Sequence, residues 1–180
     1  MNKLIVISGP SGVGKGTIVN ELLKKGDYAL SISCTTRAPR VGEKEGVSYF
    51  FISREKFKSL IDEDGFLEYD DHFGNYYGTP KDFVEKQLQT KNVILEIEVN
   101  GALEAKKSYP EAILIMIVPP SLDELKSRLI GRGTESPENI AGRLSRIEYE
   151  LSQSGKYDYT VINDDLQRAV GEIEDLIKNS

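Results

Sequence analysis

Short apolar runs recur along the chain, and each is bounded by polar or turn-forming residues. The first, Leu4 to Ile7, stops at a glycine-rich turn. A continuous apolar run of this length is typical of a strand buried on both faces of a parallel sheet. Similar runs follow at Val93 to Leu95, at Ile113 to Val118 and, more weakly, at Tyr159 to Ile162. We therefore predict four buried strands.

Helical patterns lie between and after these runs. Residues 17–25 carry apolar side chains at helical spacing, and Gly26 supplies a C-terminal stop. Capping boxes at Thr79 to Asp82 and at Ser121 to Glu124 mark two helix starts, and the Ser136-Pro137 pair places proline at a first helical position. Alternating strands and helices predict a parallel sheet that is covered by helices on both faces.

The region from about residue 34 to residue 80 interrupts this alternation. It is rich in aromatic residues and turn glycines, which favours short antiparallel strands around a helix near Glu55 to Ile61. A second interruption is Gly131 to Gly133, where two glycines flank an arginine between two helices. We expect one domain of 180 residues that contains an inserted lobe.

Composition limits the classes of partner. Hydrophobic residues make up 39% and charged residues 29% of the chain, as in globular proteins, and the net charge of −6 argues against a surface that coats nucleic acid. The longest apolar run, Ala112 to Val118, is far shorter than the roughly 20 residues of a membrane helix. The N-terminal run is too short for a signal peptide, so we expect a cytoplasmic protein with neither a nucleic-acid nor a membrane partner.

Two residue types that often carry chemistry occur once each. Cys34 has no second cysteine with which to form a disulfide, and we interpret it as a small packing residue. His72 has no second histidine or cysteine near it, which argues against a zinc site.

The turn after the first strand carries the strongest motif. Residues Gly9 to Thr17 contain the pattern G-x-x-x-x-G-K, in which backbone N–H groups cradle phosphate oxygens and Lys15 reaches the β- and γ-phosphates. The predicted helix adds the positive end of its dipole. The usual Ser or Thr after the lysine is replaced by Gly16, with Thr17 one place later. We therefore expect Mg²⁺ to be held mainly through water and nucleotide phosphates.

Two arginine clusters and a strand glutamate are further candidates. Arg37 and Arg40 lie three residues apart on a proline-stiffened loop, which favours a second phosphate site, although an exposed basic loop has the same pattern. Glu68 lies in an alternating segment, where its carboxylate is either solvated or accepts N–H donors from a guanine edge. Arg128 and Arg132, with Arg143 further along, form either a solvated basic face or a set of cations for phosphoryl transfer.

Five segments, in this order, resemble guanylate kinase over essentially the entire chain. They are Gly9 to Thr17, Ser33 to Arg40, Gly74-Asn75-Tyr76-Tyr77-Gly78, Gly131-Arg132-Gly133-Thr134 and Val161-Ile162-Asn163-Asp164-Asp165. The resemblance implies a three-layer αβα P-loop kinase fold with a parallel core sheet, an inserted small mixed β/α GMP-binding lobe and a helical lid. It divides the chain into a core (1–33, 81–125 and 147–180), a GMP-binding lobe (34–80) and a lid (126–146).

Carried over position by position, the resemblance implies three sets of site residues. The GMP-binding residues are Ser33, Arg37, Arg40, Tyr49, Glu68, Tyr77, Thr79, Glu96 and Glu98. The ATP-binding residues are Gly9, Pro10, Ser11, Gly12, Val13, Gly14, Lys15, Gly16, Thr17 and, at the adenine, Asn163. The catalytic residues are Lys15, Arg37, Arg128, Arg132 and Arg143, of which the last three match lid arginines.

Some of these matches carry a more specific implication. Glu68 and Thr79 match the residues that read guanine, whereas Glu96 and Glu98 match acids that orient Mg²⁺-bound water and the guanosine end. The family usually has Asp at the second of these acidic positions, so Glu98 departs from its pattern by one methylene. Thr17 and Glu96 are the candidate protein contacts of Mg²⁺, with no direct ligand assigned. Arg146 matches no motif, and we interpret it as a surface residue.

The resemblance implies an ATP:GMP phosphotransferase that uses Mg²⁺, with ATP as co-substrate and GMP or dGMP as acceptor, either as a monomer or as a homo-oligomer. Two alternatives remain from the sequence. One is a related P-loop kinase that acts on another monophosphate or on a phosphorylated sugar. The other is a guanylate-kinase-like binding module that takes phosphopeptides, against which the intact Lys15 loop and the lid arginines argue.

Overall fold

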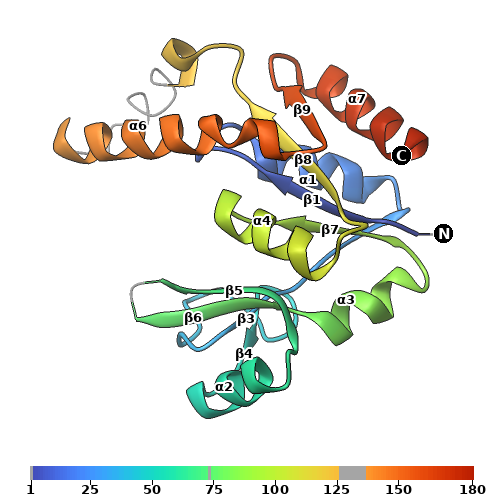
Figure 1. The fold of residues 1–180 in the computed structure, drawn as a ribbon, viewed down its shortest axis with the longest axis vertical. Helices are drawn as coiled ribbons and strands as arrows, with labels where there is room; N and C mark the ends of the chain where they lie inside the picture. The colour runs from blue at the N-terminus through green and yellow to red at the C-terminus, as the bar shows by residue number, and fades with distance from the viewer. Residues whose placement is uncertain (1, 73, 126–136) are drawn as a thin grey trace.

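The computed structural model describes residues 2–72, 74–125 and 137–180, and it contains two sheets. The larger sheet has the strand order β2-β7-β1-β8-β9, and every neighbouring pair in it is parallel. Its strands are β1 (Leu4–Ser8), β2 (Tyr28–Leu30), β7 (Asn92–Glu96), β8 (Ile113–Val118) and β9 (Tyr159–Ile162). Because β1 lies in the middle, the loop that follows it emerges at the centre of the carboxyl edge, where open α/β sheets bind ligands (Figure 1).

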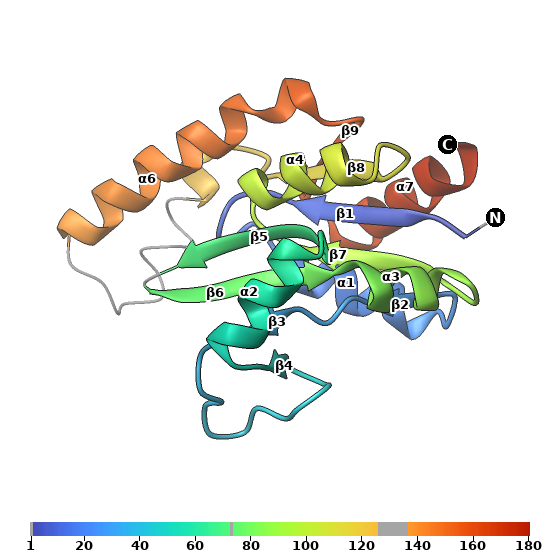
Figure 2. The same ribbon diagram turned by 60° about the horizontal axis from the view of Figure 1, so that its bottom comes forward.

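Helices cover both faces of this sheet and make a three-layer core (Figure 2). On one face, α1 (Lys15–Lys24) and α7 (Leu166–Asn179) pack on side chains such as Ile5 and Ile115. On the other face, α3 (Lys81–Leu88) and α4 (Val99–Ser108) pack on Leu4, Val6 and Leu95. Alternate residues of β1 therefore enter opposite cores, which is why the whole strand is apolar and buried.

The second sheet lies at the far end of the molecule from α7 and has the strand order β4-β3-β6-β5 (Figure 1). Its elements are β3 (Cys34–Thr35), β4 (Phe50–Phe51), α2 (Arg54–Asp62), β5 (Phe66–His72) and β6 (Asn75–Pro80). A small aromatic core holds it together: the Phe57 and Phe66 rings stack with centroids 4.4 Å apart, and buried Cys34 belongs to the same cluster.

A long helix and a short 3₁₀ turn precede the last strand of the core sheet. The long helix α6 (Pro137–Ser152) runs along one side of the molecule and is followed by a short 3₁₀ turn (Ser154–Lys156) before β9. Leu125 and Ile147 are buried together in a separate small cluster, which anchors α6 to the segment after β8. Within the described residues, no helix has the length and apolar character that crossing a bilayer requires.

The predicted fold class is confirmed, with three local differences. The Thr79 capping box is wrong, because α3 begins at Lys81 after Pro80 and the Thr79 hydroxyl is bonded to Glu68 instead. The inserted sheet is mixed, since β3 and β4 pair in parallel. The structure also adds the short edge strand β2, which no apolar run marks. The Ser121 cap is confirmed by the Glu124 backbone N–H, which donates to Ser121 Oγ over 3.1 Å.

Candidate active site

The loop between β1 and α1 has the backbone of a phosphate cradle. Gly9, Gly12 and Gly14 have φ values of +142°, +85° and +99°, a region that side chains disfavour. A Cβ on Gly9 would lie 2.2 Å from the carbonyl oxygen of Ile117, so the loop passes against β8 with no room for a side chain. Helix α1 starts at Lys15, and its free N–H groups therefore face the loop, where they favour an anion.

The Lys15 side chain folds back over this loop. Its Nζ donates to the carbonyl oxygens of Gly9 and Pro10 over 2.5 and 3.1 Å. Burial lowers the pKa of Lys15, and the nearby carboxylates of Glu96 and Glu150 oppose that shift. The ammonium therefore stands at the mouth of the loop, where a phosphate chain would meet it as a point charge.

Asn163 lies directly after β9 and packs against the loop. Its side-chain amide donates to the Val13 carbonyl oxygen over 2.8 Å. A Cβ on Gly14 would lie 2.5 Å from the same amide nitrogen, so the two residues are in close contact. The structure thus places Asn163 against the loop between β1 and α1, whereas its contact with adenine stays a prediction.

The side chains beside Gly16 carry oxygen atoms, which hard cations prefer as ligands. A Cβ on Gly16 would lie 3.5 Å from Glu96 Oε1, and Thr17 lines the same pocket as Glu96. Burial raises the pKa of Glu96, and Lys15 opposes the shift. Within residues 2–72, 74–125 and 137–180, no cluster of three or more His, Cys, Asp or Glu side chains forms a metal site. Glu96 and Thr17 offer oxygens of the kind that bind Mg²⁺ through its water ligands.

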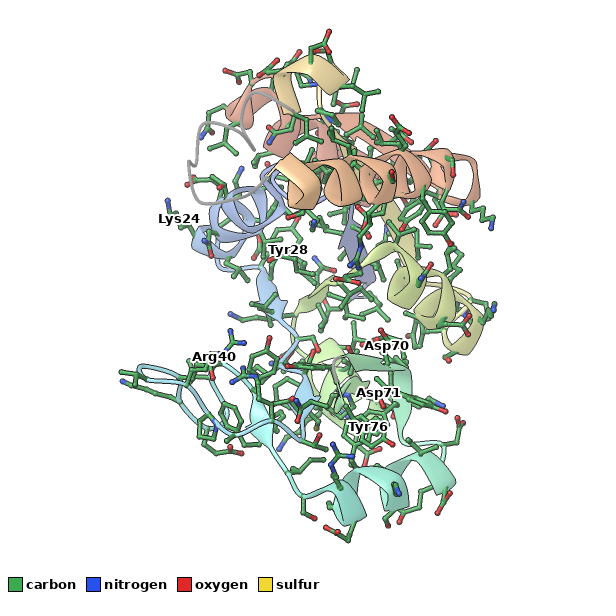
Figure 3. The ribbon with its side chains drawn as sticks, turned by 90° about the vertical axis from the view of Figure 1, so that its left-hand side faces the viewer. Lys24, Tyr28, Arg40, Asp70, Asp71 and Tyr76 are labelled. Atoms are coloured by element: carbon green, nitrogen blue, oxygen red, sulfur yellow. The ribbon has the colours of Figure 1, made fainter. Side chains whose placement is uncertain are left out.

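A cleft of about 340 Å³ opens between the second sheet and the core. Its wall on the second sheet and the preceding segment comprises Ser33, Tyr49, Glu68, Asp70, Tyr77 and Gly78. Its wall on the core comprises Glu96, Ile97, Glu98 and Gly101. Figure 3 shows Arg40 and Asp70 on the edge of the second sheet's lobe that faces the core. The cleft thus collects candidate residues that lie up to 68 positions apart in the chain, from Ser33 to Gly101.

Glu68 is the most deeply placed acid of this cleft. Its Oε1 accepts a hydrogen bond from the Thr79 hydroxyl over 2.5 Å, and its Oε2 would lie 3.1 Å from a Cβ on Gly101. Burial raises the pKa of Glu68, the hydrogen bond from Thr79 opposes this, and the charge of Asp70 adds to it. A fixed carboxylate in a half-buried pocket can accept two N–H groups from one face of a base. Thr79 is completely buried and holds that carboxylate in place.

Beside the cleft, the Arg37 side chain contacts three other side chains. It forms a two-bond ion pair with Glu43, its Nε donates to the Tyr77 hydroxyl over 3.2 Å, and its guanidinium lies 5.5 Å from the Tyr49 ring centroid. The exposed Arg40 lies on the same loop. These contacts order the arginine loop beside the cleft, since Tyr49 and Tyr77 line it, and the loop's role as a phosphate site stays a prediction.

The interpretation of Arg146 as a surface residue is only partly right. Its side chain is 52% exposed, yet it pairs with Glu98 and with Glu150. These three residues line a pocket together with Lys15 and Gly9. Burial raises the pKa of Glu150, with Arg146 opposing the shift. The longer side chain of Glu98 lets it reach helix α6 from the N-terminus of α4.

Sequence reasoning missed Glu43, Asp70, Arg146 and Glu150 as neighbours of the site. The spacing of Arg146 and Glu150 on one helix was a visible signal, whereas the remaining contacts depend on how the chain folds. Arg128 and Arg132 lie outside the described residues. Arg143 lies within α6, but its side chain is outside the described part of the structure.

The fold, the loop with Lys15 and the adjoining acidic cleft define a P-loop kinase of the three-layer α/β class. The family model for guanylate kinase matches residues 1–180. A guanylate kinase from Clostridium acetobutylicum is 52% identical over 175 residues, which are 97% of this chain and 84% of that protein. One from Caldanaerobacter subterraneus subsp. tengcongensis is 53% identical over 176 residues, again 97% of this chain and 85% of that protein.

The solved structures agree with this assignment. The crystal structure of guanylate kinase from Anaplasma phagocytophilum has a TM-score of 0.74 and 32% sequence identity, covering 99% of this chain and 85% of that one. The chain belongs to the guanylate kinase family, and it is a kinase.

Proposed function

We propose that the protein transfers the γ-phosphate of ATP to GMP, and also to dGMP, giving ADP and GDP or dGDP. One observation carries the proposal: the P-loop pocket and the cleft share Glu96, and the cleft and the Lys15–Arg146 pocket share Glu98. The phosphate loop and the cleft are thus neighbours, with Glu96 and Glu98 between them. A donor on the loop and an acceptor in the cleft would meet there with their phosphates adjacent, as phosphoryl transfer requires.

The reaction is an in-line displacement. A phosphate oxygen of GMP attacks the γ-phosphorus of ATP, a new P–O bond forms, and the bond from that phosphorus to the bridging oxygen breaks with ADP as the leaving group. No side chain has to act as a general base, because the second pKa of a phosphate monoester is about 6 and GMP is largely dianionic at neutral pH. The protein contributes alignment and positive charge.

Different residues supply that charge at the two ends of the reaction. Lys15 and the N-terminus of α1 hold the β- and γ-phosphates of ATP, while Arg37, Arg40 and Tyr77 hold the phosphate of GMP. The matched lid arginines, Arg128, Arg132 and Arg143, close over the transferring group. Closure of the lobe (34–80) and the lid (126–146) over the core excludes water, which would otherwise take the phosphate.

Mg²⁺ would bind together with ATP and would neutralise charge on the phosphate oxygens. Glu96 and Thr17, which line the loop pocket beside Gly16, would hold its water ligands. Gly16 itself offers no side-chain ligand.

Base selection comes from Glu68 and Thr79. The carboxylate accepts the N1–H and N2–H groups of guanine, whereas adenine presents an unprotonated N1 to the same position and would leave the buried acid without partners. Support for this role comes from the Thr79 hydrogen bond, which orients the carboxylate. The protein is proposed to act in the cytoplasm on these small molecules.

The test measures ADP release with ATP, Mg²⁺ and each of GMP, dGMP, AMP, UMP and CMP. The expected result is fast turnover with the two guanine nucleotides only. Lys15→Ala should abolish turnover, and Lys24→Ala, which removes a 69% exposed lysine of the same helix, should leave turnover unchanged. A folded wild-type protein that turns over none of the five would contradict the proposal and favour a phosphopeptide-binding module or another phosphorylated acceptor.

A further inference from the structure

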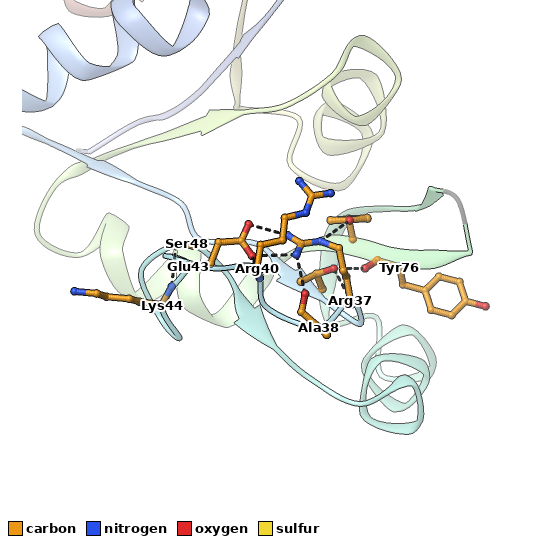
Figure 4. Close-up of polar contacts among 9 residues, drawn as sticks. Arg37, Ala38, Arg40, Glu43, Lys44, Ser48 and Tyr76 are labelled. Atoms are coloured by element: carbon orange, nitrogen blue, oxygen red, sulfur yellow. Dashed lines mark hydrogen bonds and ion pairs between the residues drawn. The ribbon is translucent and has the colours of Figure 1, made fainter.

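Glu43 occupies one fork of the Arg37 guanidinium (Figure 4). Nη1 of Arg37 donates to Glu43 Oε2 over 3.0 Å, and Nη2 donates to Oε1 over 2.9 Å. The two side chains are only 14% and 21% exposed, so solvent screens the pair weakly. Two parallel bonds fix the plane of the guanidinium as well as its position.

The contacts of Arg37 leave a defined part of it for a ligand. A guanidinium has five N–H groups. Among the described residues, those on Nη1 go to Glu43 and to the Ala38 carbonyl oxygen, one on Nη2 goes to Glu43, and Nε–H goes to the Tyr77 hydroxyl. The second N–H of Nη2 lies beside Nε, on the edge of the guanidinium that faces Tyr77. Since Tyr77 lines the cleft, this N–H lies beside a residue of the cleft wall.

Glu43 also organises the loop that carries the second arginine. Its Oε2 accepts the backbone N–H of Arg40 over 2.7 Å, while its own N–H donates to the Arg40 carbonyl oxygen over 3.0 Å. The Glu43 carboxylate therefore binds both the Arg37 side chain and the Arg40 backbone. Both interactions lower the pKa of Glu43, so the group is ionised at neutral pH.

We propose that Glu43 is a positioning residue for the acceptor phosphate: it holds the Nη1–Nη2 fork of Arg37 and so directs the remaining N–H of Nη2 to the acceptor phosphate beside Tyr77. This inference rests on the proposed function, in which the cleft takes a nucleoside monophosphate. Glu43 touches no substrate in this role. It acts through Arg37 and through the turn at Arg40.

Two physical effects of Glu43 oppose each other. Its negative charge repels an incoming phosphate, whereas its hold on Arg37 removes the rotational freedom that a long side chain would otherwise lose on binding. The charge is already neutralised by Arg37 and by the Arg40 N–H, so the repulsion is small. Positioning therefore dominates. A substitution of Glu43 distinguishes the two effects, because losing the positioning weakens phosphate binding whereas losing the repulsion strengthens it.

The experiment compares Glu43→Ala and Glu43→Gln with wild-type protein. Calorimetry measures the affinity for GMP and for guanosine, and steady-state kinetics measures the KM for GMP and for ATP. Positioning predicts that Glu43→Ala weakens GMP binding about tenfold and leaves guanosine affinity and the KM for ATP unchanged. Glu43→Gln should lose less, because it keeps one acceptor for Nη2.

The matched control is Glu45→Gln. Glu45 lies on the same loop and accepts the Phe51 backbone N–H over 2.9 Å, an acceptor that glutamine retains. This variant removes an equal charge and should bind GMP as the wild type does.

Several outcomes overturn the inference. Tighter or unchanged GMP binding in Glu43→Ala would show that repulsion dominates or that the pair is irrelevant. Equal loss of GMP and guanosine would show a structural role in the lobe. Either result, with wild-type protein that phosphorylates GMP, overturns this inference alone, whereas wild-type protein that neither binds nor phosphorylates GMP overturns the proposed function with it.

Discussion

Arg146 and Glu98 connect helix α6 to the N-terminus of α4: Nη2 of the arginine lies 2.5 Å from Oε2 of the glutamate. One turn further along α6, the Tyr149 hydroxyl donates to Asn100 Oδ1 over 3.1 Å. Arg146 also donates to Glu150, which is buried in the same pocket as Lys15. One guanidinium therefore balances two carboxylates next to the P-loop lysine.

Replacing this arginine should weaken ATP binding. Arg146→Ala leaves Glu98 and Glu150 without their partner beside Lys15, so the pocket repels a nucleoside triphosphate more strongly. We expect the KM for ATP to rise about three- to tenfold, with a smaller change for GMP. Because Arg146 is half exposed, the loss of stability should be about 1 kcal/mol, roughly 2–4 °C in Tm. Kinetics and thermal melts of the same preparation measure both.

The control is Lys107→Ala, which removes the exposed ion pair between Lys107 and Glu104 on α4. It should leave both KM values and the Tm unchanged. An Arg146→Ala enzyme with the wild-type KM for ATP would show that the two carboxylates do not influence the loop.

Guanosine binding should weaken as the pH falls. Burial raises the pKa of Glu68, so this acid takes up its proton at a pH above the ordinary glutamate range near 4.3. The protonated carboxyl loses acceptor capacity for the guanine N–H groups. The affinity should therefore be full above the raised pKa and fall below it. Guanosine, measured by calorimetry between about pH 4.5 and 8, carries no phosphate whose own titration would interfere.

Glu68→Gln separates this titration from other effects. The amide cannot ionise, so the variant should bind guanosine at least tenfold more weakly and with little dependence on pH. A variant that keeps the wild-type pH profile would assign the titration to another group.

Gly14→Ala should lower the free energy of unfolding by more than the strain of a positive φ alone. At φ +99°, alanine is strained, and its Cβ would lie 2.5 Å from Asn163 Nδ2. Asn163 must then move and lose its 2.8 Å bond to the Val13 carbonyl oxygen. We expect about 2–3 kcal/mol of lost stability by denaturant unfolding, together with a raised KM for ATP.

Gly26→Ala provides the matched comparison. Gly26 has a φ of +86° and nothing within 4 Å of a built Cβ. It should lose only about 1 kcal/mol and keep the wild-type KM for ATP. Equal losses of stability at the two positions would show that the Asn163 side chain moves aside without a loss of stability.

Gly16→Ser should lower the Mg²⁺ concentration needed for half-maximal rate. The added Cβ lies 3.5 Å from Glu96 Oε1, an ordinary contact, so the loop can accept the side chain. The new hydroxyl supplies the ligand that the usual P-loop pattern provides. Gly16→Ala adds the Cβ without the oxygen and should leave the Mg²⁺ dependence unchanged. A serine variant with the same dependence as the alanine variant would contradict the expectation.

Apolar patterning predicted most of the fold because burial on both faces leaves a continuous run in the sequence. β1, β8 and β9 were found in this way, and β7 extends its predicted run by one residue at each end. β2 was missed, since it has three residues, pairs on one side only and is partly exposed. Edge strands of that length leave no periodic signal.

The site was predictable as far as its residues form local motifs. The loop around Lys15 lies between a strand and a helix, as expected. Its glycines stand where the backbone has positive φ values, so this motif is visible in the sequence. The partners of Arg37 and Arg146 were not predictable in the same way. Glu43 approaches Arg37 across an irregular loop, and Glu98 approaches Arg146 from 48 residues away. Such contacts depend on tertiary packing, which spacing in the sequence does not encode.

Cys34, in the small aromatic core of the second sheet, has a practical consequence for measuring the proposed closure of the lobe. The side chain is 4% exposed, and burial raises the pKa of its thiol to about 11. At pH 7, only about one thiol in ten thousand is then the reactive thiolate, and reagents have little access to it. Since the chain has no other cysteine, two cysteines introduced on the second sheet and on the core can carry fluorophores for distance measurements while the native thiol stays in place.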